Sequence, residues 1–181
     1  MLFQSEQALS QFAKSLGTFF SNQGNFPVCL ELVGDVGAGK TTFARYLAQG
    51  LGISSPITSP SFTISKHYFF TPKTASESHE QSADEKCDTC LNTTSANKNH
   101  DFEFIHYDFY RLDDPGLMAD DLAESLSNRS AITVLEWADS VANILPENHL
   151  RITFKILPDG SRDLTFNQSM QTLVAKMREE E

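Results

Sequence analysis

Residues 34–41 combine glycines, a lysine and a hydroxyl at a spacing that binds phosphate groups. The segment reads Gly-Asp-Val-Gly-Ala-Gly-Lys-Thr and matches the pattern G-x-x-x-x-G-K-[ST] in full. Glycines at the fixed positions let the backbone turn tightly and bring its amide groups close to an anion. We expect Lys40 to reach the β and γ phosphates of a nucleotide, and the hydroxyl of Thr41 to ligate Mg²⁺. Phosphate contacts are also expected from the backbone of Gly34, Asp35, Val36, Gly37, Ala38 and Gly39.

The flanking residues predict the strand and the helix that such a loop needs. Residues 28–33 form an apolar run with the length of a buried strand. Residues 42–51 place Phe43, Leu47 and Leu51 four positions apart, which is helical spacing. A strand, a loop and a helix in this order direct the N-terminus of the helix toward bound phosphate.

Nucleotide hydrolysis also needs a carboxylate near the metal ion or the attacking water. Glu136 closes the apolar run 131–136, so we expect it at the carboxyl end of a core strand, where open α/β sheets bind ligands. The alternative is a solvated carboxylate at the end of a strand. Asp108 lies in the strand-like segment 101–111 and is a second candidate, with a surface ion pair to Arg111 as its alternative.

The order of helical and strand-like segments in the rest of the chain predicts an α/β domain. Further helices are expected over residues 6–20, with Ser5 as N-cap, 116–126 and 168–181, and further strands over 61–70, 150–156 and 162–166. This order favours a P-loop NTPase-like three-layer sandwich whose central sheet is mainly parallel and has an antiparallel edge. The 181 residues are expected to form one domain, 1–181, in which the polar stretch 71–100 is a flexible surface insertion.

Composition narrows the function classes. The formal net charge of −10 argues against broad binding of nucleic acid by the chain alone, because such binding needs a cationic surface. No secretion signal or membrane-length apolar run is present, so we expect a cytoplasmic protein with no membrane partner. The three cysteines predict no disulfide framework, and Cys29 is expected in the core.

A zinc site is the main competing chemistry inside the insertion. Cys87 and Cys90 have the spacing of half a zinc ligand set, and His79 and His100 lie nearby. The two histidines have no regular spacing from the cysteines, so we expect no zinc there.

Four motifs together resemble the TsaE family, also called YjeE. The family comprises bacterial ATPases required for threonylcarbamoyladenosine modification of tRNA. The motifs occur in the family's order and are residues 34–42, Ser59-Pro60-Ser61-Phe62, residues 106–112 and Leu135-Glu136-Trp137. The resemblance covers residues 1–157 apart from 71–100.

The resemblance implies a role for each matching residue. ATP and Mg²⁺ are the implied ligands. The implied catalytic residues are Lys40, Asp108 and Glu136. The implied metal ligands are Thr41, Glu136 and Asp108. Further nucleotide contacts are implied for Thr42, Ser61 and Trp137. Ser61 matches a switch-like position near the metal and the γ-phosphate, where the family usually has Thr. The family also has a short link in place of the insertion, which we expect to be tolerated on the surface.

The implied activity is a low intrinsic ATPase that works with two partner proteins, TsaD and TsaB. That pair transfers the threonylcarbamoyl group to adenosine 37 of tRNA, so tRNA is reached only indirectly. A small P-loop phosphotransferase, such as a nucleoside or metabolite kinase, is the alternative, although the insertion has no arginine to serve as a kinase lid. A regulatory subunit that binds nucleotide and scarcely hydrolyses it is a third interpretation.

Overall fold

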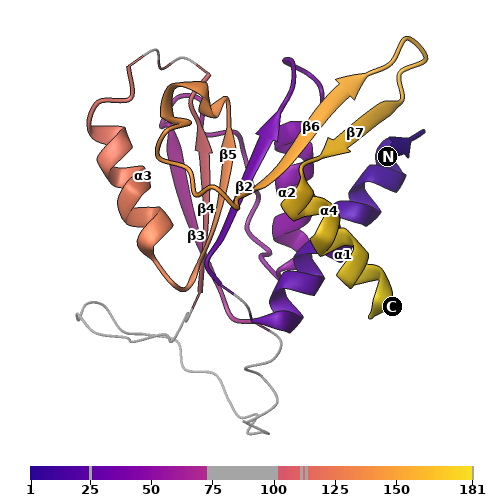
Figure 1. Ribbon diagram of the computed structural model, residues 1–181, viewed down its shortest axis with the longest axis horizontal. Coiled ribbons are helices and arrows are strands. Elements are labelled where there is room, and N and C mark those ends of the chain that lie inside the picture. The colour runs from indigo at the N-terminus through magenta and orange to yellow at the C-terminus, as the bar shows by residue number, and fades with distance from the viewer. Residues whose placement is uncertain (25, 73–101, 111, 113, 181) are drawn as a thin grey trace, which may run out of the picture.

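A twisted sheet with helices on both faces forms the centre of the protein (Figure 1). The computed structural model describes residues 1–24, 26–72, 102–110, 112 and 114–180. In this part of the chain the sheet has seven strands in the order β1-β7-β6-β2-β5-β4-β3. The strands are β1 (Leu2–Phe3), β2 (Val28–Val33), β3 (Ser65–Phe70), β4 (Phe102–Asp108), β5 (Ala131–Glu136), β6 (Leu150–Ile156) and β7 (Arg162–Phe166).

The middle of the sheet is parallel and its edges are antiparallel. Strands β6, β2, β5 and β4 pair in parallel, whereas β3 closes one edge and β7 with β1 closes the other in antiparallel pairing. This confirms the predicted fold class, with antiparallel strands at both edges. The parallel strands place their carboxyl ends at one edge of the sheet, where the predicted phosphate loop also lies.

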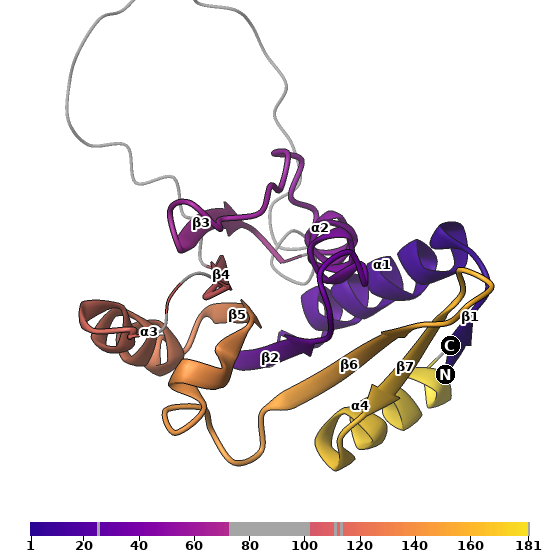
Figure 2. The ribbon, with the colours of Figure 1, turned by 90° about the horizontal axis from the view of Figure 1, so that it is seen from above.

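The helices are α1 (Glu6–Gln23), α2 (Lys40–Gly50), α3 (Leu117–Ser127) and α4 (Gln168–Glu179), with a short 3-10 helix, η2, at Ala138–Val141. Helices α1 and α2 lie on one face of the sheet and α3 on the other (Figures 1 and 2). The amide of Ala8 donates to Ser5 Oγ at 3.1 Å, which confirms Ser5 as the N-cap of α1. Among the described residues, no helix has the length and apolarity to cross a membrane.

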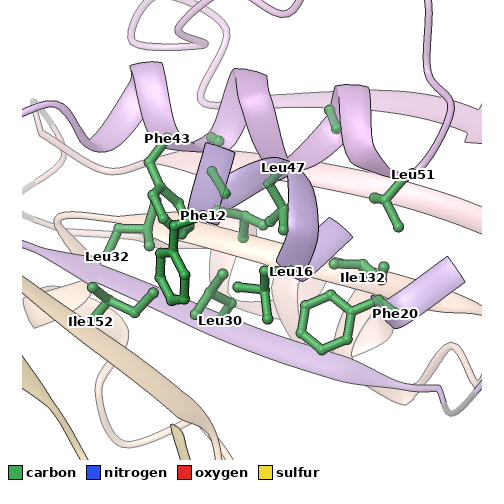
Figure 3. Packing of buried hydrophobic residues seen from close by; sticks show 14 of the residues in the cluster. Phe12, Leu16, Phe20, Leu30, Leu32, Phe43, Leu47, Leu51, Ile132 and Ile152 are labelled. Atoms are coloured by element: carbon green, nitrogen blue, oxygen red, sulfur yellow. The ribbon is translucent and has the colours of Figure 1, made fainter. Parts of the chain in front are cut away.

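The larger core lies between the sheet and the pair α1 and α2 (Figure 3). Its members are buried and include Phe12, Leu16, Phe20, Leu30, Leu32, Phe43, Leu47, Leu51, Ile132 and Ile152. Helix α4 adds Met170, Val174 and Met177 to this core, so the tail predicted as a polar helix has an apolar side. A second core under α3 joins Ile105, Tyr107, Leu122 and Leu135.

Several boundaries differ from the sequence-based expectation. Strand β3 starts at Ser65, because the amides of Thr63 and Ile64 donate to Pro60 O and form a turn. Strand β4 ends at Asp108, three residues before the predicted end. Strand β1 and helix η2 were not predicted, since they are too short for hydrophobic periodicity to show.

The expected insertion falls mostly outside the described residues. Of residues 71–100, only Thr71 and Pro72 are described. The cysteines and histidines considered for zinc lie in the undescribed part.

Two glycines allow α1 and α2 to touch backbone to backbone. A Cβ atom on Gly17 would lie 2.1 Å from Leu47 O, and one on Gly50 would lie 2.2 Å from Lys14 O. Thr18 Oγ1 donates to Gly50 O at 3.2 Å across the same contact. This close approach fixes α1 against the helix that follows the phosphate loop.

We therefore predict that Gly17→Ala lowers the free energy of unfolding by about 2–3 kcal/mol, because the added methyl forces the helices apart. At an ordinary helix position the same change would stabilise the protein by about 1 kcal/mol. Urea unfolding followed by circular dichroism measures the difference. Ser15→Ala, on the exposed side of α1, is the control and should leave stability nearly unchanged. A more stable Gly17→Ala protein would contradict the close packing.

Candidate functional site

The loop between β2 and α2 has the backbone of a phosphate cradle. Gly37 and Gly39 have φ angles of +81° and +106°, which side-chain-bearing residues rarely adopt. A Cβ atom on Gly34 would lie 2.5 Å from Phe154 O, so this position also needs glycine. Gly39 is the N-cap of α2 and no side chain caps that end. The first amides of α2 are therefore available to an anion.

Two carboxylates meet this loop at the same edge of the sheet. Asp108 ends β4 and Glu136 ends β5, and the parallel register pairs the two residues directly. Their exposed fractions are only 4% and 3%. The alternatives of a solvated Glu136 and a surface Asp108 are therefore wrong, and Arg111 lies outside the described residues.

Glu136 is tied to the phosphate loop and to the neighbouring strand. Thr41 Oγ1 donates to Glu136 Oε1 at 2.8 Å. The same oxygen lies 3.0 Å from Nε2 of His106, which is fully buried on β4. These contacts place the predicted metal ligands Thr41 and Glu136 side by side.

Asp108 holds the segment that carries the Ser-Pro-Ser-Phe motif. Ser59 Oγ donates to Asp108 Oδ2 at 2.8 Å, and Ser61 Oγ contacts the same oxygen closely. The amide of Tyr110 donates to Asp108 Oδ1 at 3.1 Å, and the amide of Asp108 donates to Ile64 O at 2.9 Å. Ser61, which was expected near the metal and the γ-phosphate, is thus fixed beside Asp108, another predicted site residue.

Lys40 points back into its own loop. Its Nζ donates to the carbonyl oxygens of Gly34 at 2.6 Å and Asp35 at 3.0 Å, and lies 4.2 Å from the centre of the Trp137 ring. Burial lowers the pKa of the Lys40 ammonium, while the negative charges of Glu136, Asp108 and Asp35 act in the opposite direction. An anionic ligand would offset this desolvation, because its negative charge would stabilise the ammonium in place of the water that burial removes.

These groups surround one cavity of about 510 Å³, within the size range of small-molecule sites. Its lining residues are Val36, Gly37, Gly39, Lys40, Thr41, Thr42, Ser59, Ser61, Phe62, Asp108, Tyr110, Glu136 and Trp137. Of the residues predicted to contact phosphate, Gly34, Asp35 and Ala38 are not among the lining residues; the carbonyls of Gly34 and Asp35 hold Lys40, and Ala38 is buried.

Three of the lining residues were not predicted as site residues. Ser59, Phe62 and Tyr110 were quoted only as parts of motifs, and no role was assigned to them. Ser59 and Ser61 both reach Asp108, their hydroxyl oxygens lie 2.6 Å apart, and the amide of Ser61 donates to Ser59 Oγ at 3.3 Å. Tyr110 packs on Trp137 with 4.9 Å between ring centres. The sequence signal for Tyr110 was its position two residues after Asp108, and Ser59 and Phe62 had only their place in the Ser-Pro-Ser-Phe motif.

The oxygen donors at the cavity suit Mg²⁺ in a nucleotide complex. Thr41 offers a hydroxyl, and Glu136 and Asp108 offer carboxylates. Within the described ranges, no three His, Cys, Asp or Glu side chains cluster as a metal site of their own.

The sequence model of one family, "Threonylcarbamoyl adenosine biosynthesis protein TsaE", matches residues 3–79 and 90–164. The chain belongs to the TsaE family. The family takes part in the biosynthesis of threonylcarbamoyladenosine in tRNA. The TsaE motifs quoted from the sequence all fall inside the matched ranges, including the cavity residues Lys40, Asp108 and Glu136.

The chain also aligns with individual TsaE proteins over most of their length. The chain is 30% identical to the Bacillus subtilis tRNA threonylcarbamoyladenosine biosynthesis protein TsaE over 138 residues, 76% of this chain and 67% of the relative. The TsaE of Treponema pallidum is 31% identical over 134 residues, 74% of this chain and 77% of the relative. The crystal structure of Bacillus subtilis YdiB superposes with a TM-score of 0.62 and 24% identity, covering 97% of this chain and 90% of that one, and supports the fold.

We predict that Ser59→Ala combined with Ser61→Ala lowers the free energy of unfolding by about 1–3 kcal/mol, because the buried Asp108 carboxylate loses both hydroxyl donors. Adding Asp108→Asn should recover part of this loss, since the uncompensated charge is then gone. Urea unfolding of the variants in a double-mutant cycle measures the coupling. Ser55→Ala, an exposed serine in the same loop, is the control. Additive effects of the serine and aspartate changes would contradict the contact.

Proposed function

We propose that this protein binds ATP with Mg²⁺ in the 510 Å³ cavity and hydrolyses it at a low intrinsic rate. The observation that carries the proposal is the meeting of one lysine, two buried carboxylates and the phosphate loop at a single edge of the sheet. Lys40, Asp108 and Glu136 come from three separate elements and all line that cavity. A site for binding alone would not need two carboxylates beside the triphosphate position.

Binding begins at the loop. The backbone amides at the start of α2 and the Lys40 ammonium face the phosphates, and Lys40 must leave the carbonyls of Gly34 and Asp35 to reach them. Those carbonyls hold the ammonium in the loop until phosphate arrives. The rings of Trp137 and Tyr110 border the cavity and offer an apolar wall to the nucleotide.

Thr41, Glu136 and Asp108 would hold Mg²⁺, directly or through water, and the bound ion supplies charge neutralisation at the β and γ phosphates. The Thr41 hydroxyl donates its hydrogen bond to Glu136 Oε1, so its oxygen lone pairs remain available to the metal ion. Ser61 presents a second hydroxyl next to Asp108.

In the hydrolysis step, a water oxygen forms a bond to the γ phosphorus and the bond from that phosphorus to the bridging oxygen of ADP breaks. A carboxylate at the cavity orients the water and accepts the proton that the water loses, and Asp108 and Glu136, which both line the cavity, are the candidates for this role. Lys40 stabilises the charge that develops on the phosphoryl oxygens. Few other groups are needed, because positioning and electrostatics account for most phosphoryl-transfer catalysis.

We further propose that the protein acts in the cytoplasm with TsaD and TsaB, and that it affects tRNA through them. Its family and the names of its relatives connect it to threonylcarbamoyladenosine biosynthesis. A net charge of −10 disfavours a tRNA groove of its own, because RNA backbones require cationic surfaces. ATP hydrolysis here would therefore be coupled to the modification through protein contacts.

We predict that Lys40→Ala abolishes ATP binding, whereas Glu136→Gln keeps binding and lowers turnover about 100-fold or more, because a neutral amide can neither accept a proton from the attacking water nor balance the charge of Mg²⁺. Fluorescence of Trp137, the only tryptophan in the chain, reports ATP binding, and phosphate release reports turnover. Lys66→Ala, which removes a partly exposed lysine that contacts Thr58 outside the cavity lining, is the control. Unchanged ATP affinity in Lys40→Ala would refute the site.

We also predict that a purified TsaD–TsaB pair together with tRNA stimulates ATP hydrolysis by the wild-type protein. Phosphate release with and without these partners measures the effect, and the Glu136→Gln protein serves as the inactive control. Transfer of phosphate to a small molecule in their absence would instead favour the phosphotransferase alternative.

A further inference from the structure

We propose that His106 is a positioning residue that sets the orientation of the Glu136 carboxylate for Mg²⁺-dependent use of ATP. The inference rests on the proposed function and extends it to a residue that does not line the cavity. His106 would act through Glu136 and would touch neither nucleotide nor metal.

The contact is made possible by strand register. His106 precedes Asp108 by two positions on β4, so both side chains lie on the same face of the sheet. His106 pairs with Val134 in the parallel register and Asp108 pairs with Glu136. The long Glu136 side chain folds back along this face, and its Oε1 lies 3.0 Å from His106 Nε2.

Two donors contact the same oxygen of the Glu136 carboxylate. A carboxylate only accepts hydrogen bonds, so the contact requires the proton of His106 to be on Nε2. Thr41 Oγ1 donates to the same Oε1. Among the hydrogen bonds of the described residues, none involves Glu136 Oε2. One oxygen is therefore anchored twice, and the other remains for the cavity.

The other nitrogen of His106 argues against a purely structural role. His106 is fully buried, and its Nδ1 has no hydrogen-bond partner among the described residues. A buried acceptor without a partner costs folding free energy, whereas an apolar side chain at this position would not. The hydrogen bond from His106 to Glu136 is the contact that an apolar side chain could not make.

A second histidine of the same chain provides the contrast. His149 Nε2 also contacts a buried carboxylate, that of Glu31, at 2.9 Å. Its Nδ1 lies 2.6 Å from Pro146 O, so both nitrogens have partners, and Arg151 contacts Glu31 as well. None of these residues lines the nucleotide cavity. His149 is thus the matched control for loss of a histidine–glutamate contact.

The test uses the full-length protein with three substitutions. His106→Gln keeps an amide donor near the position of Nε2. The side chain in His106→Asn is too short for its amide to reach Glu136. His149→Asn is the control. ATP affinity is measured by Trp137 fluorescence with Mg²⁺ and with EDTA, and turnover by phosphate release. Thermal unfolding of each variant separates folding from function.

We expect His106→Asn to lower kcat by about tenfold or more and to raise the Mg²⁺ concentration for half-saturation by a similar factor. Its ATP affinity in EDTA should be unchanged, because the loop and Lys40 are intact. His106→Gln should recover most of both properties. His149→Asn should change thermal stability alone.

Two results would overturn the role of His106. One is a His106→Asn protein with wild-type kcat and Mg²⁺ dependence, and the other is a His106→Gln protein as impaired as His106→Asn. The proposed function would instead be refuted if the ATP affinity of the wild-type protein did not depend on Mg²⁺ and the Lys40→Ala protein bound ATP equally well. The two failures are therefore distinguishable.

Discussion

The parallel pairing of β4 with β5 is the constraint on which the candidate site depends. It places Asp108 opposite Glu136 at one edge of the sheet and excludes water from most of both carboxylates. Two buried carboxylates at adjacent positions repel each other unless nearby groups donate to them. Hydroxyls from Thr41, Ser59 and Ser61 supply such donors, so the phosphate loop and the serine motif are both bound to this pair.

Packing of the two helices beside the sheet supports the same arrangement. Helix α2 starts at the phosphate loop, and its contact with α1 through Gly17 and Gly50 leaves no room for an added methyl. Movement of α2 would displace Thr41 from Glu136, because these side chains are joined by a hydrogen bond. Backbone contact between the helices therefore helps to keep the loop in register with the two carboxylates.

Much of this arrangement could be predicted from the sequence. The strands β2, β5, β6 and β7 have the boundaries that their apolar runs predict, because burial on a sheet imposes a clear pattern on short segments. The motif at residues 34–41 predicted the loop and the helix after it. By contrast, the predicted start of β3 and the predicted end of β4 were wrong, since a turn at Pro60 and the contacts of Asp108 override the strand pattern there.

The sequence by itself determined the family, the phosphate loop and the candidate carboxylates, because these depend on residue types at fixed local spacing. Only the tertiary structure decided that Asp108 is buried, that Ser59 shares its carboxylate oxygen with Ser61, and that His106 reaches Glu136. These contacts join residues 30 to 49 positions apart in the chain. Strand order and register set such distances, and neither is written in the local sequence pattern.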